Sequence, residues 1–219
     1  MLAGLVFLAF IPLVGLIPLA VLLGWLLALA RNVREGLPRP LPAWDDLVAY
    51  FSQGAPLLVA IIAYHLPLIL LNLCNSWIIG GIASGFLGSF INLLLLCIGL
   101  PLSFAYFSLA WALLVGATAE HLRTGKGTAF YRLGSAFDFL RAHDRLLLGW
   151  LGAAWLINLG LAALMLIPCL GWIAGPTLAL PAHGHLLGQV LRRANVPLKP
   201  APERPAPKPK ARPKPTQRR

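Results

Sequence analysis

The amino-acid sequence predicts an all-α membrane protein: a polytopic transmembrane helix bundle of about five spans, two amphipathic interfacial helices and a disordered C-terminal tail. Three observations predict this class. The 219 residues are 58% hydrophobic and only 11% charged, outside the range of ordinary soluble domains. Three long runs carry no charged residue. Every Lys and Arg lies in one of the three segments that follow those runs.

The uncharged runs set the expected number of spans. No Asp, Glu, Lys or Arg occurs in 1–30, 47–119 or 146–191. Because a hydrocarbon core about 30 Å thick needs about 20 apolar residues per helix, these runs have room for roughly one, two and two spans. Glycine- and proline-containing turns divide the second and third runs. We expect spans near 8–30, 55–78, 88–117, 146–167 and 172–191.

The first run could instead be a cleaved signal peptide, since small residues stand at 28–30. It lacks the basic start of a signal peptide, and its apolar run is about twice the usual length. These two features favour a retained span.

All the basic residues are expected on one side of the bundle. The segments 31–46, 120–145 and 192–219 hold all 18 Lys and Arg residues, and they follow the first, third and fifth expected spans. They therefore share one face of the membrane, which the positive-inside rule makes cytoplasmic. We expect a multi-pass protein of the cell (inner or plasma) membrane, with its N-terminus outside and its C-terminus in the cytoplasm.

The chain divides into a transmembrane helical domain, 1–195, and a Pro/Lys/Arg-rich cytoplasmic tail, 196–219. Because prolines are frequent and apolar residues few, we expect the tail to be an extended, disordered arm. The protein as a whole has the lipid bilayer as its partner. The tail has two alternative roles: it binds anionic lipid headgroups, or it is a solvated arm that only favours the topology. Nucleic acid is an unfavoured partner, because no folded reader or aromatic platform accompanies the charge.

Amphipathic periodicity resumes after the first expected span. One helix face is formed at i, i+3, i+4 and i+7 by Trp44, Leu47, Val48 and Phe51. This spacing predicts a short helix lying in the membrane interface. Asp45 and Asp46 fall in its first turn, where carboxylates interact favourably with exposed N–H groups and the helix dipole.

A similar plan recurs 89 residues later: Arg34-Glu35-Gly36 aligns with Arg123-Thr124-Gly125. The second copy predicts another interfacial helix, with Phe139 on its polar side. Its expected apolar face comprises Phe130, Leu133, Phe137 and Leu140. Internal repeats are common in transporters, but two hairpins with matching surface helices would also serve a scaffold.

The stretch Leu-Pro-x-Trp-Asp-Asp and its surroundings resemble a prokaryotic membrane-protein family known as domain of unknown function 4013. The residues that carry the resemblance are Leu41, Pro42, Trp44, Asp45, Asp46 and Gly54, together with the closing Gly188, Gln189 and Arg192. The resemblance covers roughly 20–193. The insertion of Leu-Pro-Arg-Pro at 37–40 departs from the family pattern. The family implies a multi-span membrane domain and supplies no known activity or catalytic residues.

Asp45 and Asp46 form the one candidate acid–base pair. As sequence neighbours they diverge by about 100° on a helix, and no nearby His, Cys or Ser completes a catalytic arrangement. A role at the helix start fits them better, and pairing with Arg31, Arg34 or a basic residue of the second unit is a further alternative. Because no Walker loop, HExxH, GxSxG or dinucleotide fingerprint occurs, we expect no catalytic residues and no cofactor.

Four polar side chains fall within expected spans: His65, Asn72, Asn92 and Asn158. Intramembrane polar groups are functional candidates, and the alternative is hydrogen bonding between helices. His183 and His185 suggest a metal site only weakly, since a spacing of two does not align ligands on one helix face, so we expect no metal. Cys74 and Cys169 could form an external disulfide or be buried apolar fillers.

These observations favour a non-enzymatic membrane scaffold or interaction protein with membrane-protein partners. The alternative is a transporter of small molecules or lipids, or another lipid-handling protein, which the repeat and the intramembrane polar residues would suit. A membrane-embedded enzyme is the third possibility.

The expected topology predicts the location of fused reporters. A reporter at Ser84 should read as external and one after Pro202 as cytoplasmic, because three expected spans separate these two positions. Alkaline phosphatase and fluorescent-protein fusions measure this. The reverse pattern would exclude the five-span arrangement.

Overall fold

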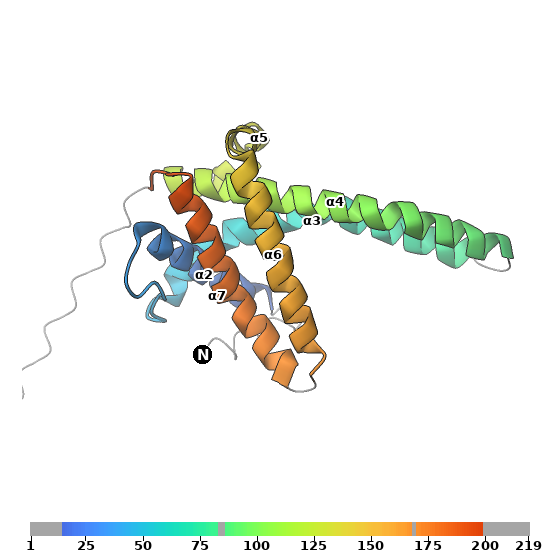
Figure 1. The fold of residues 1–219 in the computed structure, drawn as a ribbon, viewed down its shortest axis with the longest axis horizontal. Helices are drawn as coiled ribbons and strands as arrows, with labels where there is room; N and C mark the ends of the chain where they lie inside the picture. Colours follow the sequence, from blue (N-terminus) through green and yellow to red (C-terminus); the bar gives the residue numbers. More distant parts are fainter. Residues whose placement is uncertain (1–14, 83–85, 168–169, 199–219) are drawn as a thin grey trace, which may run out of the picture.

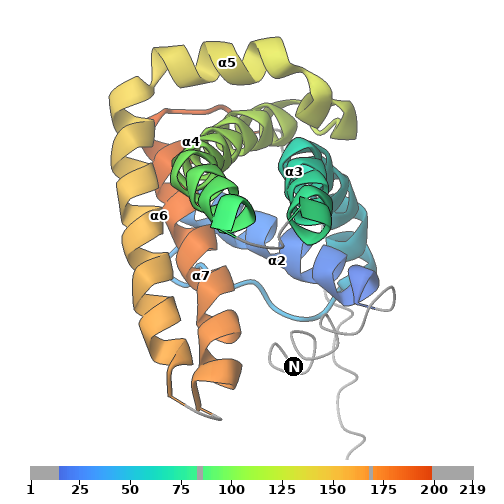
Figure 2. The same cartoon turned by 90° about the vertical axis from the view of Figure 1, so that its right-hand side faces the viewer.

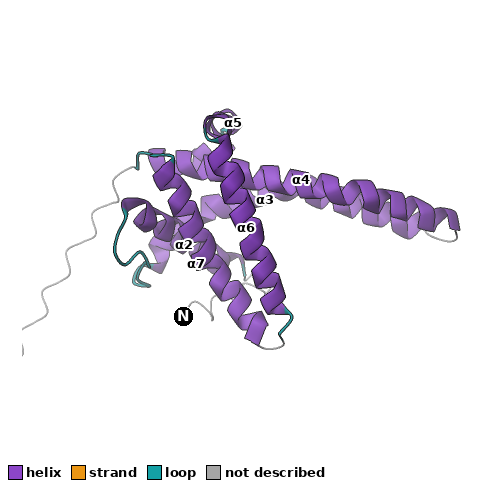
Figure 3. Ribbon diagram, viewed as in Figure 1, coloured by secondary structure: helices purple, strands orange, loops and turns teal. Residues whose placement is uncertain are grey.

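The computed structural model describes residues 15–82, 86–167 and 170–198, which are almost entirely helical (Figure 1, Figure 3). No strand occurs within these ranges. The elements are α2 (Leu16–Glu35), α3 (Leu47–Ile82), α4 (Phe86–Thr124), the 3-10 helix η1 (Gly127–Tyr131), α5 (Leu133–Ala142), α6 (Asp144–Met165) and α7 (Leu170–Arg193). The all-α class is confirmed. The predicted tail beyond residue 198 lies outside the described residues.

Two hairpins of long helices extend in different directions from a common region (Figure 1). One is formed by α3 and α4, and the other by α6 and α7. The helix α2 packs against both α3 and α7, so it connects the two hairpins. The short α5 packs on α4 and crosses to the start of α6 (Figure 2).

The central helix α2 is largely covered by its neighbours. Eleven of its 20 residues are buried, including Trp25, Leu27 and Leu29. Pro18 is tolerated because it lies in the first turn, where the N–H has no helical partner. The helix ends at Gly36, whose φ of 74° is left-handed and whose N–H reaches the carbonyl oxygens of Asn32 and Val33.

Small residues let α2 approach both of its neighbours at backbone distance. A methyl group on Gly24 would collide with the Tyr50 carbonyl oxygen of α3, and one on Gly54 would collide with the Ala20 carbonyl oxygen of α2. On the other side, a methyl group on Gly188 of α7 would lie 2.7 Å from the Ala30 carbonyl oxygen. The packing of three helices therefore requires glycine at these positions.

Four helices are long and apolar enough to cross a membrane, which indicates a membrane protein: Leu16–Glu35, Leu47–Cys74, Gly88–Thr124 and Asp144–Met165. The fifth expected span corresponds to α7, which is not among them. Its sequence includes Pro181, His183 and His185, and these lower its hydropathy. A fifth span at α7 stays a prediction.

The helices α3 and α4 are longer than a bilayer requires. At 1.5 Å per residue, the 36 residues of α3 extend about 54 Å, against a hydrocarbon core of about 30 Å. Their outer parts expose large apolar side chains, including Leu70 and Leu71 on α3 and Leu94 and Leu96 on α4. Such surfaces suit contact with lipid.

The first predicted interfacial helix is wrong as a separate element. Helix α3 runs without a break from Leu47 into the expected second span, although Pro56 lies inside it. The expected break does not occur because Gly54 packs against α2, and Leu57 and Leu58 are buried in the core beside it. A separate short helix does occur in the second charged segment as α5, which ends at Ala142. Its location in the membrane interface stays a prediction.

The two aligned glycines have the same structural role. Gly36 follows α2 with φ 74°, and Gly125 follows α4 with φ 69°, a conformation that costs glycine little. Both therefore end an apolar helix at the start of a charged segment. An internal duplication stays a prediction.

The close approach of α2 and α3 predicts opposite effects of the same substitution at two helical glycines. Replacing glycine by alanine gains up to about 1 kcal/mol of helix propensity at either position. Gly54→Ala should nevertheless lower the thermal unfolding midpoint in detergent, because overpacking costs about 1–3 kcal/mol. Gly152→Ala is the control, since nothing lies within 4 Å of its added methyl group. Equal midpoints for the two variants would contradict the contact.

Candidate functional site

The three charged segments meet at one end of the molecule, here called the polar end, which comprises 31–46, 120–145 and 192–198. Arg34 Nε donates a hydrogen bond of 3.1 Å to the carbonyl oxygen of Val196, joining the first segment to the third. A cavity of about 320 Å³ joins the second to the third. Its lining includes Glu120, Arg123, Ser135, Asp138, His143 and Asn195.

The Leu-Pro-x-Trp-Asp-Asp element is fixed against α2 and the start of α3. Trp25 Nε1 of α2 donates to the Pro42 carbonyl oxygen at 3.2 Å, and Tyr50 of α3 donates its hydroxyl to the Ala43 carbonyl oxygen at 2.6 Å. The ring of Trp44 stacks on that of Trp25, with a centroid separation of 5.1 Å and an interplanar angle of 5°. The segment is therefore an ordered part of the fold.

The preceding turn is anchored in the same way. Asn32 Nδ2 donates to the Pro40 carbonyl oxygen at 2.8 Å, so a side-chain amide of α2 binds the turn that follows this helix. Leu41 is exposed, whereas Pro42 is buried. The proline-rich stretch thus follows the surface of α2 before α3 begins.

Asp46 has a structural task at the start of α3. Its Oδ1 accepts the N–H of Ala49 at 2.9 Å, the bond of a helix N-cap. Asp46 therefore lies at the start of the helix, but as the N-cap before Leu47 and not in the first turn, where the sequence pattern predicts it. Asp45 is exposed beside it. The two aspartates occupy successive positions on the surface, and no catalytic side chain is brought against Asp46 in the hydrogen bonds of the described residues.

The second unit is anchored through Phe130, which is fully buried. Its carbonyl oxygen accepts the hydroxyl of Tyr64 from α3 at 3.0 Å. Its ring stacks on His121 at a centroid distance of 4.8 Å, and His121 Nδ1 donates to the Lys126 carbonyl oxygen at 3.0 Å. Through these bonds η1 is held against both α3 and α4.

One residue of α5 differs from the prediction. Leu133 and Phe137, expected on the apolar face of an interfacial helix, are exposed by 51% and 37%, which is compatible with contact with lipid. Phe139, expected on the polar side, packs on the core, and Ala136 is fully buried against Gly116 of α4. The 10-residue helix has apolar side chains on two faces, so periodicity alone could not identify the packed one.

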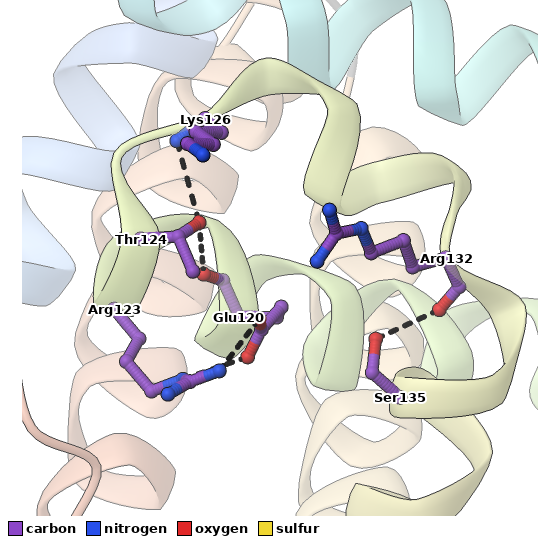
Figure 4. A network of polar contacts seen from close by, with 6 residues as sticks. All are labelled: Glu120, Arg123, Thr124, Lys126, Arg132 and Ser135. Atoms are coloured by element: carbon purple, nitrogen blue, oxygen red, sulfur yellow. Dashed lines mark hydrogen bonds and ion pairs between the residues drawn. The ribbon is translucent and has the colours of Figure 1, made fainter.

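A network of polar contacts lies at the C-terminal end of α4 (Figure 4). Arg123 binds both carboxylate oxygens of Glu120 through Nε and Nη2, each at 2.8 Å. Thr124 donates its hydroxyl to the Glu120 carbonyl oxygen at 2.8 Å and accepts the Lys126 N–H at 3.3 Å. The Glu120 carboxylate is therefore used in a bidentate ion pair inside the site.

The intramembrane polar candidates fall in two places. His65 and Asn72 line one cavity of about 350 Å³ between α3 and α4. Asn158 of α6 lies elsewhere and accepts a hydrogen bond of 3.3 Å from His183 of α7, as expected for an interhelical contact. The side chain of Asn92 lies outside the described residues.

The closing motif belongs to the packing of α7 on α2. Gly188 allows the close contact described above, and Gln189 donates to His185 Nε2 of the preceding turn at 2.9 Å. Arg192 is exposed, with its guanidinium beside Gly36. These residues position the end of α7 at the polar end.

His183 and His185 bind different partners, and no group of three or more metal-ligating side chains occurs in the part of the chain that the structure describes. Cys74 and Cys97 are free and exposed on the long hairpin. Cys169 lies outside the described residues, so a bridge to it stays a prediction.

The sequence reasoning missed Trp25, Asn32, Tyr64 and His121, which hold the polar end together. All four are side chains with a polar atom in or beside an apolar run. All four donate to backbone carbonyl oxygens of the charged segments, Tyr64 to that of Phe130 in η1. The sequence feature that could have indicated this role is a residue with a hydrogen-bonding side chain that lies in an apolar run close to a predicted turn.

One comparison with known proteins finds a match. A family model described as "Protein of unknown function (DUF4013)" matches residues 7–170, which include the Leu-Pro-x-Trp-Asp-Asp element and end before Gly188. No curated protein and no solved structure matches the chain.

The capping bond predicts that Asp46 matters for stability through its side-chain oxygen rather than its charge. Asp46→Ala should destabilise the protein by about 1 kcal/mol, the usual cost of removing an N-cap. Asp46→Asn keeps an accepting oxygen and should retain wild-type thermal stability in detergent. An Asp46→Asn variant that folds normally but loses a defined product would contradict the structural role and favour an enzyme.

Proposed function

Because the chain belongs to the family described as "Protein of unknown function (DUF4013)", its role has to be inferred from its own residues, and we propose that it is a multi-pass membrane scaffold. In this proposal the polar end is a rigid, non-enzymatic platform that binds other membrane proteins. The observation that carries the proposal is the junction of the three charged segments into one ordered surface. Arg34 and Val196, which are 162 residues apart, join across it.

The polar groups of this platform support binding rather than turnover. Asp46 caps a helix, Glu120 is paired with Arg123, and Tyr50 holds the turn before α3. A general acid or base needs a proton-accepting or proton-donating atom within hydrogen-bond reach of a substrate. Groups already held in structural bonds favour a fixed surface instead.

The outward face of α5 is the part of the platform best suited to a partner. Leu133 and Phe137 of α5 are exposed by 51% and 37%, and Tyr131 at the end of η1 is exposed by 53%, next to the exposed Arg132. Aromatic side chains and arginine are enriched in protein interfaces. Because Ala136 and Phe139 fix the opposite face on the core, this surface is presented without further folding.

The membrane setting in this proposal follows the charge distribution. The polar end faces the cytoplasm, in line with the positive-inside rule, and the protein resides in the cell membrane. The described chain reaches Leu198 at this end, after Val196, whose N–H is bonded to the Leu191 carbonyl oxygen at 3.1 Å. In this proposal the Lys and Arg residues of 199–219 bind anionic lipid headgroups.

Lipid handling or transport is the second candidate, and one observation favours it. His65 and Asn72 line the same cavity in the long α3–α4 hairpin, within a helix that is long and apolar enough to cross a membrane. Polar groups at such positions mark substrate paths in many transporters.

The platform predicts that a photoreactive amino acid at position 137 captures a protein partner in native membranes. Benzoylphenylalanine should replace Phe137 with little disturbance, because the ring is partly exposed. Crosslinking should give a discrete adduct that is lost when Leu133→Asp is added, since a charge disrupts an apolar contact. Mass spectrometry identifies the partner.

The matched control carries the same photoreactive residue at Leu148, which is exposed by 68% on α6. This position should label lipid and no discrete protein. The same adducts from both positions, or lipid adducts alone from position 137, would exclude a docking platform on α5.

A further inference from the structure

The cavity between α3 and α4 is small, shallow, broadly open and mostly apolar. Its volume is about 350 Å³, in the lower range of ligand sites. Its walls comprise His65, Leu68, Ile69, Asn72 and Leu73 from α3 and Phe107 from α4. Only two of these six side chains contain polar atoms.

The hydrogen bond of His65 determines which of its ring nitrogens donates and which accepts. Nδ1 lies 2.8 Å from the carbonyl oxygen of Ile61, one turn earlier in the same helix. A carbonyl oxygen can only accept, so Nδ1 carries the hydrogen. In the neutral imidazole the other nitrogen, Nε2, is then an acceptor. The ring edge packs on Phe107 at a centroid distance of 5.1 Å, which holds its orientation.

The walls select against a charged ligand. No Lys, Arg, Asp or Glu lines the cavity, and burying an unpaired charge among apolar side chains is costly. The cavity also lies within Leu47–Cys74, a segment suited to crossing a membrane, and its neighbours Leu66 and Leu70 are exposed apolar side chains. A ligand therefore reaches it from the bilayer and carries an apolar chain.

We infer that this cavity binds the hydroxyl group of a neutral lipid alcohol. The hydroxyl donates to His65 Nε2, and the first part of the chain lies along Leu68, Ile69 and Leu73. Asn72 lies two helical turns further along α3, about 10.5 Å from His65 at 1.5 Å per residue, where its Nδ2 donates to the Leu68 carbonyl oxygen at 2.8 Å. The inference rests on the lipid-handling candidate and is independent of the platform on α5.

The test uses the full chain reconstituted in phosphatidylcholine nanodiscs. Two photoreactive probes have the same chain and diazirine and differ only at the head: one is a long-chain alcohol and the other is the corresponding fatty acid, ionised at neutral pH. After irradiation, adducts are mapped by mass spectrometry. The alcohol should label the α3 segment around Leu68–Leu73 and the α4 segment around Phe107, and the acid should not.

Two variants remove the site in different ways. His65→Ala should reduce labelling by the alcohol roughly tenfold, the factor expected when one hydrogen bond is lost. Leu68→Trp fills the cavity and should also reduce labelling, which keeps the test informative if either variant folds poorly. Leu66→Ala is the control, because Leu66 is exposed on α3 and does not line the cavity.

Competition identifies the source of the alcohol. Unlabelled diacylglycerol or an unlabelled polyisoprenoid alcohol should displace the probe, and displacement by either supports the site. Labelling that is unchanged in both His65→Ala and Leu68→Trp, equal labelling by the acid, or displacement by neither competitor would overturn the inference. Such a failure leaves the crosslinking at position 137 unaffected, since the two experiments share no residue.

Discussion

The backbone contact between α2 and its two neighbours is the constraint on which the rest of the structure depends. Gly24 and Gly54 bring α2 against α3, and Gly188 brings α7 against the other side of α2. In a membrane, where lipid is as apolar as a leucine side chain, close packing at small residues is a main source of helix association. This packing places the end of α2 beside the end of α7, so that Arg34 reaches Val196.

The polar end is a consequence of that arrangement, and it is held by side chains that donate to backbone carbonyl oxygens. Trp25 and Asn32 fix the first charged segment in this way, and Tyr64 and His121 fix the second. Turns whose carbonyl oxygens are satisfied by a helix do not need a partner to become ordered. The surface that remains available is the outer face of α5. The cavity at His65 lies apart from it in the long hairpin, so the two proposed binding regions share no residue.

Much of this fold follows from the sequence, because charge and apolar length are local properties. The helix ends at Gly36 and Gly125 and the separate α5 agree with the sequence pattern, whereas α3 begins at Leu47 instead of Trp44. The exceptions depend on contacts between distant residues. The predicted separation between the first interfacial helix and the second span is absent, since α3 is continuous and its Gly54 packs on Ala20 of α2. Phe139 turns inward because Gly116 leaves room beside it. Likewise, Trp25 could not be assigned to the site from sequence, since its partner at Pro42 is separated from it by the end of a helix and a turn.

The central claim, that the charged segments are folded onto the packed helices, is tested most directly by disulfide trapping between α3 and η1, which lies in the second charged segment. An ideal Cβ on Gly127 lies 3.2 Å from the Cβ of Pro56, close to the separation of about 3.5 to 4.5 Å found in disulfides. In a variant without Cys74, Cys97 and Cys169, the pair Pro56→Cys and Gly127→Cys should form an intramolecular disulfide on mild oxidation in native membranes. Ile62→Cys with Gly127→Cys, on another face of α3, should not. Absence of the 56–127 disulfide, or its formation only between two chains, would contradict the account.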